Sequence, residues 1–292
     1  MGERRMKMKP AHSKRLNRSL GGDAIIFIML GVMGVFMALP LYLSVISAFK
    51  PQEEIFLFPP KLYAMHPTLE NFSSMTKIVS NLWVPFSRYM FNSIIVSVIG
   101  TLGYLVIATM AAYPLAKCNF PGKKTLNSLI TTALMFTAAV TALPKYIVMS
   151  VLGLIDSYYA LILPTFAGTM GVFLCVQFLE TLPGSLIEAG KVDGAGDYRI
   201  FFQLVIPNIR PVIFTILIFQ FQTVWNQTSG DYIYSEELKT LPMVLSQIAT
   251  AGISRAGVGS AAALLLIIPP ILIFVLSQSN VMETMAHSGL KE

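Results

Sequence analysis

Six segments without a charged residue constrain this sequence more than any other feature. They are residues 24–49, 89–116, 125–144, 157–179, 211–230 and 256–282, and each contains at least 20 residues. A helix needs about 20 apolar residues, at about 1.5 Å per residue, to cross the hydrocarbon core of a bilayer. We therefore predict an all-α, polytopic membrane protein with six transmembrane helices, one for each segment.

The composition excludes the main alternatives to a bundle of membrane helices. Hydrophobic residues make up 54% of the chain and charged residues only 12%, whereas a soluble domain has about 25% charged residues. A soluble enzyme is therefore excluded. A membrane β-barrel would alternate apolar and polar residues over strands of about 10 residues, but residues 25–30 form one unbroken apolar run.

The distribution of Lys and Arg predicts the orientation in the membrane. Residues 1–23 form a basic tail, and the positive-inside rule places such a tail in the cytoplasm. With six crossings in residues 24–282, the short tail of residues 283–292 is cytoplasmic too. About two thirds of the 21 Lys and Arg residues then lie on the cytoplasmic side. The first segment is too long for the apolar region of a cleavable signal, about 7 to 15 residues, so we expect it to be retained.

The sequence contains no motif for catalysis or for a resident cofactor. The patterns GxxxxGK[ST], HExxH and GxSxG are absent, and His12, His66 and His287 fall in different topological segments. Cys118 and Cys175 fit no extracellular disulfide framework. The net charge of +6 follows from the orientation signal, so we expect no nucleic-acid partner. We predict that this chain is not an enzyme and holds no metal.

The charge-free segments also argue against an autonomous pump. Ion-coupled transporters usually relay protons through Asp or Glu inside the membrane, and these segments contain neither residue type. The nearest basic residue is Lys145, directly after the third segment. If the protein moves a solute uphill, the energy must come from a partner subunit.

The connection between the fourth and fifth segments, residues 180–210, predicts a docking surface. Ser185 and Glu188 have the spacing of a capping box, and Asp197 suits the N-cap of a following helix. A helix stop at Gly194 would separate the two helices. One side of this helix–turn–helix unit has only small side chains, which allows another protein to approach closely. The small residues are Ala189, Gly190, Gly194, Ala195 and Gly196.

Three groups of residues in and after this connection carry a family resemblance: Glu188-Ala189-Gly190, Asp193-Gly194-Ala195, and Ile206-Pro207 with Pro211. They are similar to the EAA loop of binding-protein-dependent ABC importer permeases. In that family the loop is a coupling helix that sits in a cleft of the ATPase subunit. The resemblance implies that Glu188 is the charged contact. The other coupling residues would be Ala189, Gly190, Asp193, Gly194 and Ala195.

Two points about this loop stay open at the level of sequence. Glu188 either docks to the ATPase and caps its helix or only caps it. Gly190 stands where the family usually has a second alanine. Glycine is about 1 kcal/mol less favourable than alanine inside a helix, so we expect a shorter or looser coupling helix here.

Further motifs resemble the sugar-importer branch of the family, the maltose-type second permease. They are Phe49-Lys50-Pro51, residues 67–72 in the outer loop of about residues 50–88, Asn92-Ser93, residues 111–117 with 120–123, residues 152–156, and Trp225-Asn226. The resemblance implies the type I ABC importer permease fold in a bacterial cytoplasmic membrane. It also implies four kinds of partner: a second related permease, two copies of an ATPase that bind ATP and magnesium, an extracytoplasmic solute-binding protein, and a carbohydrate substrate. Membrane lipid would surround the assembled complex.

Four residues are candidates for the substrate path, each with a structural alternative. Gln222 and Asn226 are four residues apart and share a helix face, where they line the path or bond a neighbouring helix. Trp225 lines the path or belongs to the aromatic belt at the membrane interface. Lys145 attracts an acidic saccharide or extends its side chain to the interface. The stripe of Ala108, Ala112 and Ala116 predicts close helix packing.

The resemblance thus implies a permease subunit that forms half of the translocation path of an ATP-driven oligosaccharide importer and couples to the ATPase through residues 180–210. Two other functions stay open. One is an ABC permease for another solute, such as an amino acid or phosphate. The other is a channel or scaffold whose 180–210 connection binds a cytoplasmic protein.

Overall fold

The computed structural model describes residues 20–80, 84–249 and 255–288, and within these ranges every regular element is a helix. Four helices are long and apolar enough to cross a membrane: Gly21–Phe49, Phe86–Lys117, Tyr158–Thr181 and Ala256–Gln278. Two bent helix pairs raise the count to six if each pair is one span. The predicted all-α membrane fold is confirmed, with four to six crossings in the described part of the chain. The basic tail lies largely outside the described residues.

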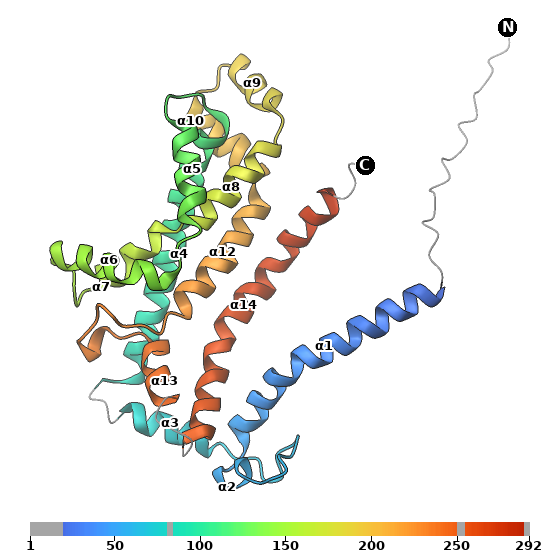
Figure 1. Ribbon diagram of the computed structural model, residues 1–292, viewed down its shortest axis with the longest axis vertical. Coiled ribbons are helices and arrows are strands. Elements are labelled where there is room, and N and C mark those ends of the chain that lie inside the picture. The colour runs from blue at the N-terminus through green and yellow to red at the C-terminus, as the bar shows by residue number, and fades with distance from the viewer. Residues whose placement is uncertain (1–19, 81–83, 250–254, 289–292) are drawn as a thin grey trace.

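Three of the charge-free segments form single long helices (Figure 1). They are α1 (Leu20–Phe49), α4 (Phe86–Lys117) and α14 (Ala256–Ser288). The last helix therefore extends through residues 283–288 of the predicted C-terminal tail. Each contains at least one proline, which membrane helices tolerate because neighbouring groups satisfy the freed carbonyl.

The third and fourth segments are divided into shorter helices, which the absence of charge did not reveal. The third divides into α5 (Lys123–Ala133) and α6 (Ala138–Val151), which meet at 111°. Lys145 therefore lies in the middle of α6, and not near the outer end of one long helix. The fourth comprises α7 (Tyr158–Ile162), the 3₁₀-helix η1 (Leu163–Ala167) and α8 (Met170–Thr181).

The fifth segment forms α12 (Arg210–Trp225), which is bent by 76° from the preceding helical stretch Asp197–Asn208. That stretch consists of α10 (Asp197–Ile200), the π-helical turn η2 (Phe201–Val205) and α11 (Ile206–Asn208). Pro207 and Pro211 flank the bend. Because proline lacks the N–H group of a regular helix, the two prolines interrupt the hydrogen-bond ladder on both sides of Ile209.

Helix α4 forms the centre of the bundle and packs against α8 and α12. Ala108 and Ala112 are fully buried on its packed face, which confirms the predicted small-residue stripe. The hydroxyl of Tyr104 accepts a hydrogen bond from the Gly171 N–H at 2.6 Å. A Cβ at Gly171 would lie 2.5 Å from that oxygen, so only glycine allows α8 to approach so closely.

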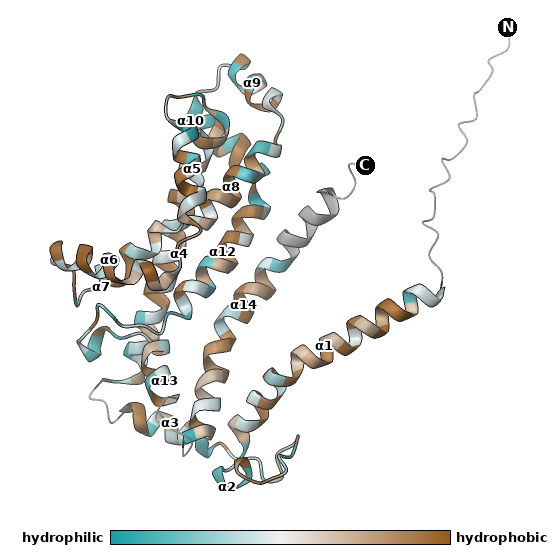
Figure 2. Cartoon of the chain, viewed as in Figure 1, coloured by the Kyte–Doolittle hydropathy of each residue, from teal (hydrophilic) through white to brown (hydrophobic). Residues whose placement is uncertain are grey.

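Helix α14 begins at the end of the molecule where α3 lies and runs beside α12 (Figure 1). It packs against α12, α1, α3 (Glu70–Ser80) and α13 (Leu241–Ala249). Helices α1 and α14 diverge from the end where α2 (Gln52–Ile55) and α3 lie (Figure 1). The most apolar part of α1 contains no buried residue, and Figure 2 shows the helix as largely hydrophobic along its length. In a membrane this surface is covered by lipid or by another protein.

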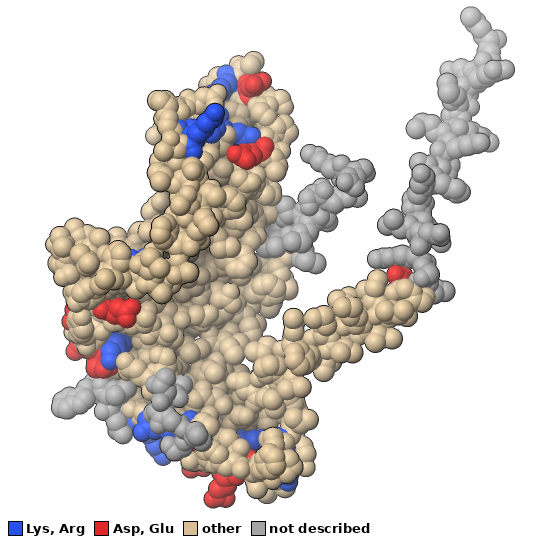
Figure 3. Space-filling model, viewed as in Figure 1, with Lys and Arg blue, Asp and Glu red and all other residues tan. Residues whose placement is uncertain are grey.

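Charged residues gather at the two ends of the described structure, with an uncharged stretch between them (Figure 3). One end carries α9 (Gly184–Val192) and α10, and the other carries α2, α3 and the loop that contains the 3₁₀-helix η3 (Glu236–Leu238). This distribution matches a protein whose middle lies in hydrocarbon, since a charge at the bilayer centre costs several kcal/mol.

Candidate functional site

The 180–210 connection folds as the predicted helix–turn–helix. Helix α9 ends at Val192, and Gly194 follows in the left-handed conformation with φ of +76°. The Ala195 N–H donates to the Gly190 carbonyl and the Gly194 N–H to the Lys191 carbonyl, both at 3.0 Å. These two bonds form a Schellman motif, so the predicted stop at Gly194 is confirmed.

Both predicted N-caps in this connection are wrong. Helix α9 begins at Gly184 with Pro183 as its N-cap, so Ser185 lies inside the first turn and no side chain caps the helix. The capping box of Ser185 and Glu188 is therefore not formed. Asp197 is the first residue of α10, whose N-cap is Gly196. The Asp197 carboxylate instead lies 4.0 Å from the Lys191 ammonium.

The six candidate coupling residues divide into an outer and an inner set. Glu188, Ala189, Asp193 and Gly194 are exposed on the connection, whereas Gly190 is buried and Ala195 is half-buried. No other described residue bonds to the Glu188 carboxylate. Gly190 faces the second helix, because a Cβ there would lie 2.8 Å from Leu204 Cδ1 and 3.3 Å from Ile200 Cγ1. This contact gives a packing reason for glycine at the position.

The connection is built into the same apolar core as the membrane helices. Ile187 of α9, with Ile200 and Phe201 of the second helix, belongs to the buried cluster that contains Leu105 of α4 and Ile216 of α12. A displacement of α9 therefore acts directly on side chains that pack against α4 and α12.

Two lysines fix the neighbouring end of α4. The Lys117 ammonium donates to the Leu182 carbonyl at 2.6 Å, directly before α9. The Lys123 ammonium donates to the carbonyls of Ala116 and Cys118 at 3.0 and 3.1 Å. Cations stabilise helix C-termini because the last carbonyls lack partners. These lysines thus have a structural role besides contributing to the excess of Lys and Arg on the predicted cytoplasmic side.

The four candidate path residues do not come together. Gln222 and Asn226 are both exposed, and the Asn226 N–H donates to the Gln222 carbonyl at 3.0 Å. Gln222 borders a mainly apolar groove of about 420 Å³ between α12 and α14. Lys145 is exposed on α6 and borders a different cavity.

Trp225 joins two helices. Its side chain is only 2% exposed, its indole N–H donates to the Leu266 carbonyl of α14 at 2.9 Å, and its ring stacks on that of Phe221. The indole therefore lies in the contact between α12 and α14, away from the Lys145 cavity.

The cavity beside Lys145 contains polar residues that the sequence reasoning missed. Its volume is about 360 Å³, and its polar lining is Lys145, Thr165, Gln220, Thr223, Gln227, Ser229, Asp231 and Tyr232. A second cavity of about 270 Å³ shares Gly168, Gln220 and Thr223 with the first. Together they run along one face of α12. The signal was the polar spacing of residues 220, 223 and 227, which follows the helical repeat.

A network of hydrogen bonds holds the loop that borders this cavity. The Asp156 carboxylate accepts from the backbone N–H groups of Tyr234 and Ser235 at 3.0 and 2.8 Å, and also from the Ser235 hydroxyl. The Ser235 hydroxyl and N–H, followed by the Tyr234 N–H, hold the pKa of Asp156 below its ordinary value despite partial burial. The Asn92 amide donates to the carbonyls of Glu237 and Lys239 at 2.8 and 2.9 Å. Both ends of the loop are therefore tied to the bundle.

The residues described contain no group of three or more His, Cys, Asp or Glu that could hold a metal ion. A bundle of apolar helices, a folded charged connection at one end and a polar cavity along α12 define the class of polytopic membrane permeases. The chain belongs to the family of binding-protein-dependent transport system inner membrane components, whose sequence model matches residues 105–285. It is a multi-pass protein of the inner membrane.

Relatives of known sequence span nearly the same length. The chain is 30% identical over 275 residues to the sn-glycerol-3-phosphate transport system permease protein UgpE of Yersinia enterocolitica, covering 88% of this chain and 94% of that one. It is 29% identical over 221 residues to the polygalacturonan/rhamnogalacturonan transport system permease protein YtcP of Bacillus subtilis, covering 76% and 75%. Protein LplC of Bacillus subtilis is 30% identical over 232 residues, covering 77% and 75%.

A solved structure shares the fold. It is a bacterial ABC transporter involved in the import of the acidic polysaccharide alginate. The similar chain has a TM-score of 0.76 at 21% identity, and the match covers 91% of this chain and 99% of that one. At this identity the likeness supports the overall fold alone.

Proposed function

We propose that this chain is a permease subunit of an ATP-driven carbohydrate importer in a bacterial cytoplasmic membrane, where it forms half of the translocation path. The observation that carries the proposal is the placement of helix α9. One side of α9 is exposed, and the other side packs into the apolar core that α4 and α12 share. The chain also belongs to the binding-protein-dependent family. Such a unit transmits force from a partner to the membrane helices. The chain itself is a transport component, and we assign ATP hydrolysis, with ATP and magnesium, to the partner.

The proposed assembly has four further kinds of component. They are a second related permease, a pair of ATPase subunits beneath the membrane on the α9 side, an extracytoplasmic solute-binding protein at the opposite end, and the carbohydrate itself. Glu188 is the proposed charged contact, because its carboxylate is exposed and bonds no other described residue. The proposal places α9 and both termini in the cytoplasm, following the basic tail.

The proposed substrate path runs along the polar face of α12. The Gln220 amide donates to the Thr165 carbonyl at 2.9 Å and the Thr223 hydroxyl donates to the Phe219 carbonyl at 2.8 Å, so both side chains keep an oxygen that can accept a hydrogen bond from a sugar. The Gln227 amide and Lys145 lie in the same cavity. We keep Gln222 and Asn226 as candidates on the neighbouring exposed face. Two of the similar proteins are named for the transport of polysaccharides, one of polygalacturonan/rhamnogalacturonan and one of alginate, which supports the carbohydrate class.

A phosphorylated polyol is the second candidate substrate. The UgpE relative belongs to a transport system for sn-glycerol-3-phosphate, and the ammonium of Lys145 is a suitable partner for a phosphate. An acidic or phosphorylated substrate would use the positive charge of Lys145, whereas a neutral one would not.

The experiment is reconstitution with the genetic neighbours. The purified complex, placed in proteoliposomes with its solute-binding protein, is assayed for ATP-dependent uptake of labelled galacturonate oligomers, neutral oligosaccharides and sn-glycerol-3-phosphate. We expect uptake of one saccharide class. A monodisperse homo-oligomer that conducts solute without any ATPase would refute the proposal.

A further inference from the structure

The face of α4 that points away from the bundle differs in composition from the packed face. Exposed side chains on it are all large and apolar, and they recur at helical spacing as Phe91, Ile94, Val98, Leu102, Val106 and Met110. From the first to the last of these, the stripe covers about 28 Å at about 1.5 Å per residue. It therefore matches the thickness of the hydrocarbon core, about 30 Å.

The packed face of α4 carries the residues that mediate helix–helix contact. Gly100, Ala108 and Ala112 are buried there against neighbouring elements. Small residues allow membrane helices to approach, whereas large aliphatic side chains without polar partners are typical of a surface covered by lipid. The outer stripe contains no small residue, which favours lipid over another helix as its neighbour.

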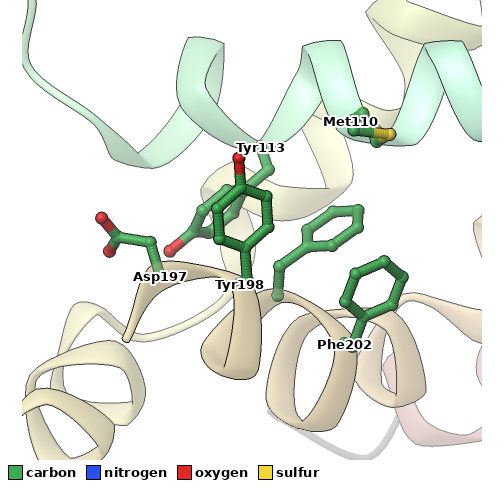
Figure 4. Close-up of a pocket in the computed structure, with 6 residues that line it drawn as sticks. Met110, Tyr113, Asp197, Tyr198 and Phe202 are labelled. Carbon is green, nitrogen blue, oxygen red and sulfur yellow. The ribbon is translucent and has the colours of Figure 1, made fainter. Parts of the chain in front are cut away.

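The stripe leads into an apolar cavity of about 120 Å³ between α4 and the 180–210 connection (Figure 4). Met110 and Tyr113 form the α4 wall, and Tyr198, Phe201 and Phe202 form the other. Figure 4 shows the rings of Tyr198 and Phe202 beside α4, with Asp197 at the margin. Tyr198 is 80% exposed and Phe202 60% exposed, so the chain does not cover these two rings, whereas Phe201 is buried.

The position of the cavity is that of the membrane–water interface. Met110 lies seven residues before Lys117, the last residue of α4, which corresponds to about 10 Å. The second wall belongs to a helical stretch bent by 76° from the span α12. Aromatic side chains are enriched at this depth because their rings are apolar and their edges polar. Arg199 is exposed next to Tyr198, and its Nε–H donates to the Gln203 side-chain oxygen at 2.9 Å. The guanidinium has further N–H groups that can donate to a lipid headgroup.

We propose that this cavity holds a phospholipid of the leaflet on the α9 side. One acyl chain lies along Leu102, Val106 and Met110, the part of the stripe nearest α9, and the glycerol end lies against Tyr198 and Phe202. The bound lipid would fill the angle between α4 and the coupling connection. This site is independent of the transported substrate, and it would exist whichever solute the complex carries.

The first experiment identifies the neighbour directly. The photoreactive residue p-benzoyl-phenylalanine replaces Met110 in the complete complex, which is embedded in nanodiscs that contain a radiolabelled phospholipid and then irradiated. We expect label on this chain and no protein adduct. A cross-link to the second permease or to an ATPase subunit would overturn the proposal, because a protein would then occupy the site.

The second experiment counts the retained lipid. Native mass spectrometry compares the purified wild-type complex with a Tyr198→Ser/Phe202→Ser double variant and with a Tyr198→Phe/Phe202→Leu variant that keeps the apolar surface. We expect the serine variant to lose one phospholipid per copy of this chain and the conservative variant to retain it. Phe36→Ser on α1, where the native ring is 76% exposed, is the control. Equal lipid counts in all four complexes would overturn the proposal.

Discussion

Gly190 and Leu204 meet across the turn of the 180–210 connection so closely that a Cβ on the glycine would lie 2.8 Å from the Leu204 Cδ1 atom. The contact seats α9 on the helical stretch that leads into α12. Glycine at position 190, where the family usually has alanine, thus lets α9 lie against its neighbour without any shift of the Leu204 side chain.

The first prediction follows from this contact. Gly190→Ala should be tolerated, because the facing atom is the end of a flexible side chain and alanine gains about 1 kcal/mol of helix propensity. Gly190→Leu should displace α9 and reduce ATPase co-purification, since overpacking costs about 1–3 kcal/mol. Gly184→Leu is the matched control, because nothing lies within 4 Å of a Cβ there. Equal loss of ATPase in both leucine variants would show that the Gly190 contact is irrelevant.

The second prediction concerns the helix stop. Gly194 has φ of +76°, a conformation that costs a residue with a Cβ roughly 1–2 kcal/mol. Gly194→Ala should therefore lower the thermal stability of the complex and weaken ATPase retention. Gly196→Ala should have little effect on either quantity, because φ at Gly196 is −70° and the position is open. The measurement is the melting temperature and ATPase stoichiometry of both variants.

The sequence predicted the elements that are fixed by local chemistry. Long charge-free runs gave α1, α4 and α14, and Gly194 gave the helix stop because few other residues adopt its backbone conformation. The predicted start of α9 at Ser185 was wrong, and the reason is also local. Pro183 supplies an extended N-cap residue two positions before Ser185, so the helix begins earlier than the capping-box spacing indicates.

The breaks and the cavity depend on contacts between elements, which one sequence does not reveal. Nothing in the charge pattern distinguishes the sharp turn between α5 and α6 from a straight span. The spacing of residues 220, 223 and 227 indicates a polar face, but the cavity exists only because α6 and the loop around Asp231 lie beside that face. Gln222 and Trp225 were reasonable candidates by residue type, but the fold turns them toward α14.

The third prediction compares the polar cavity beside Lys145 with the groove between α12 and α14. Gln227→Leu and Lys145→Met should reduce ATP-dependent uptake without loss of assembly or basal ATP hydrolysis, because they remove polar groups from the cavity without emptying a packed core. Asn226→Leu and Gln222→Leu test the neighbouring face in the same assay. Wild-type uptake in the first pair, with reduced uptake in the second, would move the path to the groove between α12 and α14.

The fourth prediction is a pH dependence of the loop held by Asp156. Hydrogen bonds from Ser235 hold the pKa of this carboxyl below its ordinary value of 3.8. A carboxyl whose pKa is lower in the folded state stabilises that state above its ordinary pKa, and the contribution is lost as the pH falls through the folded value. The loop should therefore stay attached at neutral pH and loosen progressively as the pH falls below the ordinary pKa of the carboxyl toward its lower value in the folded state.

Ser235→Ala removes the largest of these contributions, so the pKa of Asp156 should rise toward its ordinary value and the loop should loosen at higher pH. Acid-stable protease cleavage across residues 231–239, followed by mass spectrometry, measures this loosening. Ser229→Ala in the same loop is the control, since Ser229 makes no bond to Asp156. Identical pH profiles for the two variants would rule out the Asp156–Ser235 bond as the anchor.

The central claim is that α9 couples an ATPase to the membrane helices through Glu188. The decisive measurement is ATPase co-elution and substrate-stimulated ATP hydrolysis of reconstituted Glu188→Gln and Ser185→Ala complexes. Glu188→Gln removes a charge available for a charge-assisted hydrogen bond, which is roughly twice as strong as a neutral one, whereas Ser185 caps nothing. We predict that Glu188→Gln loses ATPase or uncouples hydrolysis from uptake and that Ser185→Ala behaves as wild type. Wild-type coupling in Glu188→Gln, or greater damage from Ser185→Ala, would contradict the claim.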